Sequence, residues 1–291
     1  MFAQIIKLIR PHQYIKNLFI IAPLFFAGAI TDQQALIASL LAFVFFSISA
    51  SAIYVLNDLK DVNEDRLHPV KRDRPIASGR ISIPQAWILF SALLALGLLG
   101  AYWLSEMLFY IVLLYVMLNV LYSLGLKHIS IVDIAIIAFG FVLRILAGSA
   151  VIQIPPSMWI ILMTFLLALF LALAKRRDDV LLATQGKQTR KNIDGYNLEF
   201  VNAAMVIMSS VVTVSYIFYT ISDEVQMRLQ TEYLYLTVIF VILGIMRYMQ
   251  ITFVENNSGS PTKIVLKDRF LQITIVLWAA SFGAIIYSNG I

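Results

Sequence analysis

Residues 40–65 read LLAFVFFSISASAIYVLNDLKDVNED, an apolar stretch that ends in a run of acidic and amide side chains. The apolar part, residues 40–56, has the length and composition of a membrane-spanning helix. Four of the nine residues from Asn57 to Asp65 are carboxylates, which are costly at the rim of a bilayer unless a cation or water meets them. The stretch therefore predicts a helix that leaves a membrane with a cluster of charge at its mouth.

The acidic residues recur at a helical spacing. If the helix continues through them, Asp58, Asp61 and Asp65 share one face, and Asn57 adds an amide oxygen one turn before Asp61. Clustered hard oxygen ligands suit Mg²⁺, which proteins usually hold through one or two carboxylates and a substrate's phosphates. The alternative interpretation is a solvated helix end whose charges face water.

A basic segment follows at once and shifts the balance between these interpretations. It contains two prolines and the cations Arg66, Lys71, Arg72 and Arg74. Arginine holds phosphate oxygens through a planar fork and lysine as a point charge. A topology signal or a surface for anionic lipids would also place cations here. The carboxylates and the cations together favour a site for a metal and a diphosphate.

The composition of the whole chain fixes its class. Of its 291 residues, 60% are hydrophobic and 13% are charged, and the mean hydropathy is +0.84. A soluble domain of this size cannot bury so much apolar surface, so we expect an all-α, polytopic membrane protein. Cysteine is absent, which excludes disulfides and thiol chemistry. No nucleic-acid partner is expected.

Hydropathy predicts about nine membrane-spanning helices. They are expected near residues 14–30, 34–56, 84–104, 107–124, 131–152, 156–174, 200–221, 233–250 and 270–287. The first is short and contains Pro23, which predicts a tilted or broken span. The segment before it, residues 1–13, has the pattern of an amphipathic helix on the membrane surface rather than of a cleavable signal peptide.

The distribution of basic residues predicts the orientation. Given these spans, every Lys and Arg except Arg144 and Arg228 lies on the side of the N-terminus. The positive-inside rule then places the N-terminus and the candidate chemical groups in the cytoplasm. We expect one integral-membrane domain over residues 1–291, whose cytoplasmic polar segments are residues 58–83, 175–197 and 251–269.

A second polar group follows the sixth predicted span. Lys175 and Asp179 are one helical turn apart, so an ammonium and a carboxylate share a face at the membrane exit. A positive-inside anchor would give the same pattern. The loop over residues 185–196 adds Lys187, Arg190 and Lys191, enough charge for a partly ordered lid.

Two other sets of charges stand out. Arg144 lies about three turns into its predicted span, beyond Asp133, and either pairs with a buried partner or binds a phosphate at the floor of a cavity. Lys267, Asp268 and Arg269 precede the last span and could face the same cavity.

These motifs resemble the UbiA superfamily of intramembrane prenyltransferases. The spacing Asn57-Asp58-x-x-Asp61-x-x-x-Asp65 is similar to the first aspartate-rich motif of that superfamily. Further segments resemble its branch of decaprenyl-phosphate phosphoribosyltransferases: Arg10-Pro11-His12-Gln13-Tyr14-Ile15-Lys16-Asn17, Asp65-Arg66-x-His68-Pro69-x-Lys71-Arg72-x-Arg74-Pro75-Ile76-Ala77-x-Gly79, Gly125-Leu126-Lys127-His128, Arg144-x-x-Ala147-Gly148, Lys175-Arg176 and Lys267-Asp268-Arg269. Lys175 stands where the superfamily's second motif has its first aspartate, a departure that agrees with this branch.

The resemblance implies a fold, a reaction and a set of site residues. The fold is a UbiA-like bundle in the bacterial inner membrane with a cytoplasm-facing cavity. The reaction moves 5-phosphoribosyl from 5-phosphoribosyl 1-diphosphate to a polyprenyl (decaprenyl-type) monophosphate and releases diphosphate. Asp58 and Asp61 are the catalytic residues and hold Mg²⁺, with Asn57 and Asp65 as further ligands. The substrate-binding residues are Lys16, Asn17, Arg66, Lys71, Arg72, Arg74, Lys127, Arg144, Lys175, Arg176, Asp179, Lys267 and Arg269. Whether the protein forms a homo-oligomer is left open.

Two other functions remain open at this point. The first is a prenyltransferase that joins a polyprenyl diphosphate to an aromatic acceptor, as elsewhere in the superfamily. The second is a transporter of anionic metabolites. A transporter needs polar residues near the middle of the bilayer, and the predicted spans contain few of them.

Overall fold

The computed structural model describes residues 2–185 and 193–288, and every regular element within these ranges is helical. In chain order the α-helices and 3₁₀-helices (η) are α1 (Phe2–Ile9), η1 (Pro11–Ile20), α2 (Ala22–Phe26), α3 (Gln33–Lys60), α4 (Val62–Leu67), η2 (Lys71–Asp73), α5 (Ile83–Leu104), α6 (Glu106–Leu124), η3 (Leu126–His128), α7 (Val132–Ile152), α8 (Met158–Thr184), η4 (Ile193–Gly195), α9 (Leu198–Ile221), α10 (Asp223–Leu229), η5 (Tyr233–Thr237), α11 (Val238–Phe253), α12 (Pro261–Lys267) and α13 (Arg269–Ser288). The prediction of an all-α chain is confirmed.

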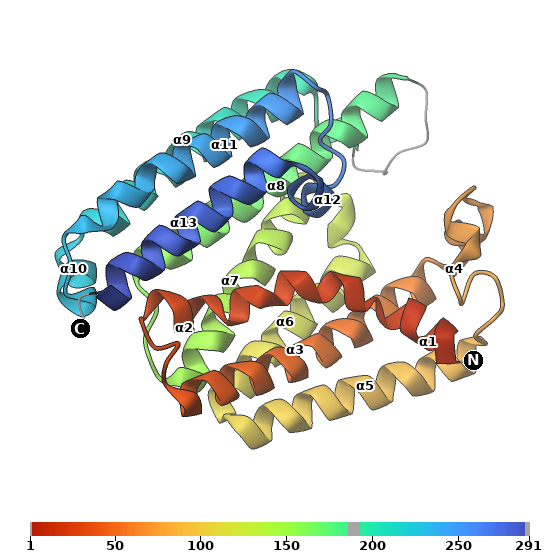
Figure 1. Ribbon diagram of the computed structural model, residues 1–291. Helices are drawn as coiled ribbons and strands as arrows, with labels where there is room; N and C mark the ends of the chain where they lie inside the picture. Colours follow the sequence, from red (N-terminus) through yellow and green to blue (C-terminus); the bar gives the residue numbers. More distant parts are fainter. Residues whose placement is uncertain (1, 186–192, 289–291) are drawn as a thin grey trace. The chain divides into compact units, whose positions relative to one another are not determined.

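Eight helical segments in the described ranges are long and apolar enough to cross a membrane. They are α3, α5, α6, α7, α8, α9, the η5–α11 pair and α13, and they match the second to ninth predicted spans (Figure 1). The first predicted span instead consists of η1 followed by the short helix α2. Arg10 ends α1 in the left-handed conformation, with φ 54°, and Pro23 lies at the start of α2. The first predicted span is therefore broken, one of the two outcomes predicted, and the break lies between Ile20 and Ala22.

The chain divides into two compact units, Met1–Lys127 with Leu143–Pro156 and His128–Val142 with Ser157–Ile291, so that the boundary falls within α7. In the first unit, α3 packs against α5, α6 and η1. Small residues allow this close approach, since a Cβ atom on Gly97 of α5 would lie 2.2 Å from Ser49 Oγ of α3. The rings of Phe46 and Tyr115 meet at a tilt in the first unit's core, with centroids 4.6 Å apart. The polar end of α3 is thus carried on a tightly packed helix.

In the second unit, α8 packs against α9, and α11 packs against both α9 and α13 (Figure 1). Its core includes Phe170 and Met205. Three of its polar side chains bond across helices: Trp278 Nε1 donates to the Tyr216 hydroxyl over 2.7 Å, and this hydroxyl lies 2.6 Å from Thr237 Oγ1. Such bonds are needed where a lipid-embedded group cannot reach water.

Candidate functional site

The acidic stretch does not form one continuous helix. Helix α3 ends at Lys60, Asp61 takes φ −90° and ψ 5°, and α4 begins at Val62. The backbone hydrogen bonds still bridge the break, because Asp61 N donates to Asn57 O and Asp65 N donates to Asp61 O. The backbone spacing expected of a helix therefore continues through the three aspartates, although the helix is interrupted at Asp61. Their partners differ, since Asp61 contacts another side chain than Asp58 and Asp65 do.

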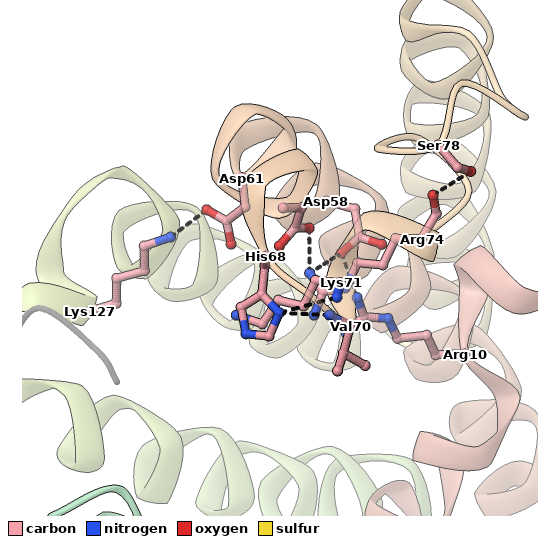
Figure 2. A network of polar contacts seen from close by, with 10 residues as sticks. Arg10, Asp58, Asp61, His68, Val70, Lys71, Arg74, Ser78 and Lys127 are labelled. Carbon is pink, nitrogen blue, oxygen red and sulfur yellow. Dashed lines mark hydrogen bonds and ion pairs between the residues drawn. The ribbon is translucent and has the colours of Figure 1, made fainter. Parts of the chain in front are cut away.

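Asp58 and Asp65 share one arginine. Arg74 Nη1 lies 3.1 Å from Asp58 Oδ1 (Figure 2). The same nitrogen lies 2.7 Å from Asp65 Oδ2. Arg10 Nη2 contacts the same Asp58 oxygen at 2.5 Å, and its guanidinium lies over the ring of Tyr54. Both aspartates are buried. A buried carboxylate pair thus meets two half-exposed arginines, one from the N-terminal segment and one from the basic loop.

Asp61 is held from η3, the short helix that follows α6. Lys127 Nζ lies 2.7 Å from Asp61 Oδ1, and Figure 2 shows this pair pointing away from the Asp58–Arg74 contact. Ser123 Oγ donates to Asn57 Oδ1. The segment from Ser123 to Lys127 therefore fixes both the amide and the carboxylate that border the helix break. Lys127, a predicted substrate-binding residue, contacts a predicted metal ligand.

The basic loop is held by its own backbone contacts. His68 Nδ1 accepts hydrogen bonds from Val70 N at 3.1 Å and Lys71 N at 3.3 Å (Figure 2). Arg66 Nε donates to Ala77 O over 3.4 Å. The side chains of Lys71 and Arg72 are exposed on η2. The loop therefore presents two exposed cations beside Arg74, as a clamp for an anion requires.

Arg144 and Asn17 belong to a separate, buried cluster in the first unit. Arg144 Nε donates to Asn17 Oδ1 over 2.8 Å, and Asn17 Nδ2 donates to Ser47 Oγ over 2.8 Å. The Arg144 guanidinium also lies 5.1 Å from the ring centroids of both Phe46 and Tyr115. These contacts with one amide and two aromatic rings favour the first of the two roles predicted for Arg144, pairing with a buried partner, over phosphate binding. Lys16, next to Asn17, is half-buried.

The second unit contains a buried network around Arg176. Arg176 contacts Asp133 Oδ2 at 2.8 Å and Asp179 Oδ2 at 2.6 Å. Tyr196 donates to Asp133 Oδ1 over 2.6 Å and accepts from Ile131 N over 2.7 Å. Burial and the hydrogen bond to Asp133 raise the pKa of Tyr196, so its hydroxyl remains a donor at neutral pH. Lys175 is exposed beside this network.

The charged residues Lys267, Asp268 and Arg269 at the start of α13 differ in their surroundings. Asp268 accepts from Arg247 Nη2 at 2.7 Å and from Leu271 N at 2.9 Å, so it joins α11 to α13 and caps α13. The hydrogen bond from Arg247 lowers the pKa of the Asp268 carboxyl. The flanking Lys267 and Arg269 are exposed. Lys187, Arg190 and Lys191 of the predicted lid lie outside the described residues.

Three residues enter these clusters that sequence reasoning did not place in the site. Arg10 was visible only as part of the N-terminal motif, and its partner Asp58 is 48 positions away. Asp133 was noted as a charge near a span end, and Tyr196 was not singled out. Helical spacing reports neighbours on one helix, so it cannot find pairs that form between helices.

The oxygen ligands of the acidic cluster, Asp58, Asp61 and Asp65, suit a hard cation, but too few of them lie together to surround one ion. Among the described residues there is no group of three or more His, Cys, Asp or Glu placed to hold one metal. Asp58 and Asp65 do lie close enough to share one Arg74 nitrogen. Two such carboxylates fit a Mg²⁺ ion whose remaining ligands come from water and phosphate oxygens. A closed cage made only of protein ligands does not fit.

Comparison with known proteins identifies the family of the chain. The model of the UbiA prenyltransferase family matches residues 18–263. A decaprenyl-phosphate phosphoribosyltransferase of Mycolicibacterium smegmatis is 34% identical over 97% of this chain and 92% of its own length. One of Mycobacterium tuberculosis is 31% identical over 97% of this chain and 94% of its own. The solved structure of an Archaeoglobus fulgidus UbiA homolog bound to GPP and Mg²⁺ has the same fold, with a TM-score of 0.71 at 22% identity over 98% of this chain and 99% of that one. The chain belongs to the UbiA prenyltransferase family.

Proposed function

We propose that this protein transfers 5-phosphoribosyl from 5-phosphoribosyl 1-diphosphate to a polyprenyl monophosphate of the decaprenyl type, at the cytoplasmic face of the membrane. The near full-length similarity to two decaprenyl-phosphate phosphoribosyltransferases supports the substrate pair. One observation in the structure carries the proposal: Arg74 joins the buried carboxylates of Asp58 and Asp65 beside the exposed cations of Lys71 and Arg72. Carboxylates that can hold a metal, next to cations that can hold phosphate oxygens, suit a diphosphate leaving group.

The residues of the first unit divide the work on the donor. Asp58 and Asp65, with Asp61 and Asn57 next to them, would hold Mg²⁺ against the diphosphate. When bound, the metal supplies Lewis-acid neutralisation of the leaving group. Lys71, Arg72 and Arg74 would bind the remaining diphosphate oxygens or the 5-phosphate, with Arg66 at the edge of the loop.

The proposed bond changes need no strong base. A lipid phosphate oxygen forms the new bond to ribose C1, and the bond from C1 to the diphosphate oxygen breaks with its electron pair leaving on diphosphate. The acceptor is already an anion, so no proton must be removed first. Attack opposite the leaving group predicts inversion at C1. The loop cations would stabilise the negative charge that develops on diphosphate in the transition state.

Other predicted site residues receive less direct roles. Arg144 and Asn17 would position η1, and with it Lys16, through their buried contacts. In the second unit, Arg176 would support Asp179, which it contacts at 2.6 Å. The exposed Lys175, Lys267 and Arg269 stay predicted ligands of the lipid phosphate. Apolar helix faces that contact the bilayer would accommodate the polyprenyl chain.

The test is a labelled-lipid assay. Purified protein in nanodiscs receives 5-phosphoribosyl 1-diphosphate labelled in the ribose, together with decaprenyl phosphate, with and without Mg²⁺. We expect label in the lipid fraction only when Mg²⁺ and the lipid are both present. Label that stays in the aqueous phase under all conditions, from protein shown to be folded, would reject the proposal.

A second candidate is favoured by the family itself. The Archaeoglobus fulgidus homolog with the same fold is bound to GPP, a prenyl diphosphate, and Mg²⁺. Under this alternative a labelled polyprenyl diphosphate would be joined to an aromatic acceptor, and the ribose label would not enter lipid. Running both donors in parallel separates the two functions.

A further inference from the structure

Each aspartate of the candidate metal site is already bound by a cation of the protein. Arg10 and Arg74 contact Asp58, Arg74 contacts Asp65, and Lys127 contacts Asp61. The three cations come from three different segments: the residue after α1, the end of the basic loop and the η3 turn. The acidic cluster is therefore neutralised, carboxylate by carboxylate, by fixed side chains.

This arrangement opposes the entry of a bare divalent cation. A metal on Asp58 Oδ1 or Asp65 Oδ2 must compete with an arginine for the same oxygen, and it adds two positive charges beside Arg10 and Arg74. The repulsion is strong because both aspartates are buried and poorly screened. No cage of three carboxylates exists among the described residues to offset it.

A diphosphate changes the balance. It brings several negative charges and oxygen acceptors in one group. An arginine or lysine that leaves a carboxylate can then bind a phosphate oxygen instead, so its charge stays compensated. The carboxylate oxygen that it leaves becomes a metal ligand, and the diphosphate supplies further ligands to the same ion. Before and after this exchange, each carboxylate and each side-chain cation has a partner of opposite charge.

We propose that Arg10, Arg74 and Lys127 act as built-in counter-ions that keep a bare divalent cation out and make its binding depend on the diphosphate. Arg74 is the central member, since one of its nitrogens serves both buried carboxylates. The inference deepens the proposed function and rests on it only for the statement that the ligand is a diphosphate. It assigns Arg10 and Lys127 a function in metal selectivity that follows from their contacts.

The experiment measures metal binding rather than turnover. Mn²⁺, in place of Mg²⁺, is dialysed to equilibrium against the purified full chain in nanodiscs, first alone and then as a preformed complex with inorganic diphosphate. In the wild type we expect the complex to bind more tightly than the bare ion. In Arg74→Gln the affinity for bare Mn²⁺ should rise by about tenfold, because the competing charge has gone. Lys127→Gln should raise it less, since the pair with Asp61 is more exposed.

Arg80→Gln is the matched control, because Arg80 is an exposed cation of the same segment. It should leave the affinity for bare Mn²⁺ unchanged. Thermal unfolding identifies a misfolded variant, and Arg10→Gln then replaces it, since Arg10 reaches Asp58 from another segment. Unchanged or weaker binding of bare Mn²⁺ in the folded variants would overturn the inference, as would a wild type that binds bare Mn²⁺ as tightly as the complex.

The outcomes for this inference and for the proposed function are separable. If the wild type labels lipid but the variants do not bind bare metal more tightly, the counter-ion role is wrong and the proposed reaction stands. If metal binding depends on diphosphate as expected but no ribose label enters lipid, the counter-ion role stands and the proposed reaction is wrong.

Discussion

Two clusters of arginine and aspartate, one in each unit, use the same chemistry in different surroundings. In the first unit, Arg10 and Arg74 keep 24% and 28% of their side chains exposed while they contact Asp58. In the second, Arg176 and Asp133 are 1% and 0% exposed, and Tyr196 occupies the remaining Asp133 oxygen. A cluster with partly hydrated cations can exchange partners for a ligand. A fully buried cluster with bonds to both aspartate oxygens is suited to hold helices together.

The largest expected effect would come from breaking the buried cluster. Asp133→Ala leaves Arg176 without one carboxylate and removes the acceptor of Tyr196. We expect a loss of about 3–5 kcal/mol in the free energy of unfolding, because a buried guanidinium loses one of its two carboxylate partners and a buried hydroxyl loses its acceptor. Unfolding in detergent measures it. Asp223→Ala, at an exposed carboxylate of the same unit, should change it by less than about 0.5 kcal/mol. A small loss in Asp133→Ala would mean that the two clusters do not differ in this way.

The next effect falls on activity instead of stability. Asp58→Asn keeps an oxygen acceptor for Arg10 and Arg74 but removes the negative charge that the metal needs. We expect lipid labelling to fall by about 10²–10³-fold with the fold retained. Asp73→Asn changes an exposed carboxylate of the neighbouring loop and should label lipid like the wild type. Full activity of Asp58→Asn would remove the acidic cluster from the proposed site.

A smaller effect tests how the buried cluster is completed. Tyr196→Phe removes one hydroxyl that donates to Asp133 and accepts from Ile131 N. We expect a loss of about 1–3 kcal/mol in the free energy of unfolding, the cost of leaving buried polar groups unpaired. Tyr235→Phe, at a half-exposed tyrosine of the same unit, is the control and should have almost no effect. Equal unfolding curves for the two variants would show that water can replace the Tyr196 hydroxyl.

The smallest effect concerns a half-buried pair that belongs to neither cluster. Arg247 lowers the pKa of Asp268 in the folded protein. A depressed carboxyl pKa contributes stability above the unfolded value of about 4, and this contribution is lost as the pH falls through the lower folded pKa. The melting temperature of the wild type should therefore drop more between neutral and strongly acidic pH than that of Arg247→Gln. Parallel curves would mean that the pair is too well hydrated to matter.

Hydropathy was sufficient for most of the fold. It located eight helices, since an apolar run of about twenty residues has one stable form in a bilayer. It did not predict the 3₁₀-helix η1, in which Asn17 is buried and which overlaps a segment expected to be a tilted or broken span. The contacts of Asn17 with Arg144 and Ser47 explain how this polar residue is tolerated.

The sequence predicted residues of the candidate site but not the contacts between them. The motif identified Asp58, Asp61, Asp65 and Arg74, and the structure shows how they are connected. The helix break at Asp61 coincides with contacts from Ser123 of α6 and Lys127 of η3, and Lys127 is 66 positions away from Asp61 in the chain. Arg176, which the resemblance predicts as a substrate-binding residue, is buried and contacts Asp133 on α7, 43 positions away in the chain. Pairing between helices is set by packing, which local spacing does not report.

The contact between Arg74 and Asp65 also closes a ring of the main chain. The two residues are nine positions apart, and the segment between them contains His68, Pro69 and the exposed η2. The entropy of closing such a ring grows only slowly with its length, by about 0.6 kcal/mol for each doubling. The loop could therefore be lengthened, or carry a spectroscopic label at exposed Val70, while the contact between Arg74 and Asp65 at its base is kept. Distance measurements from a label at Val70 would report when the contact between Arg74 and Asp65 breaks.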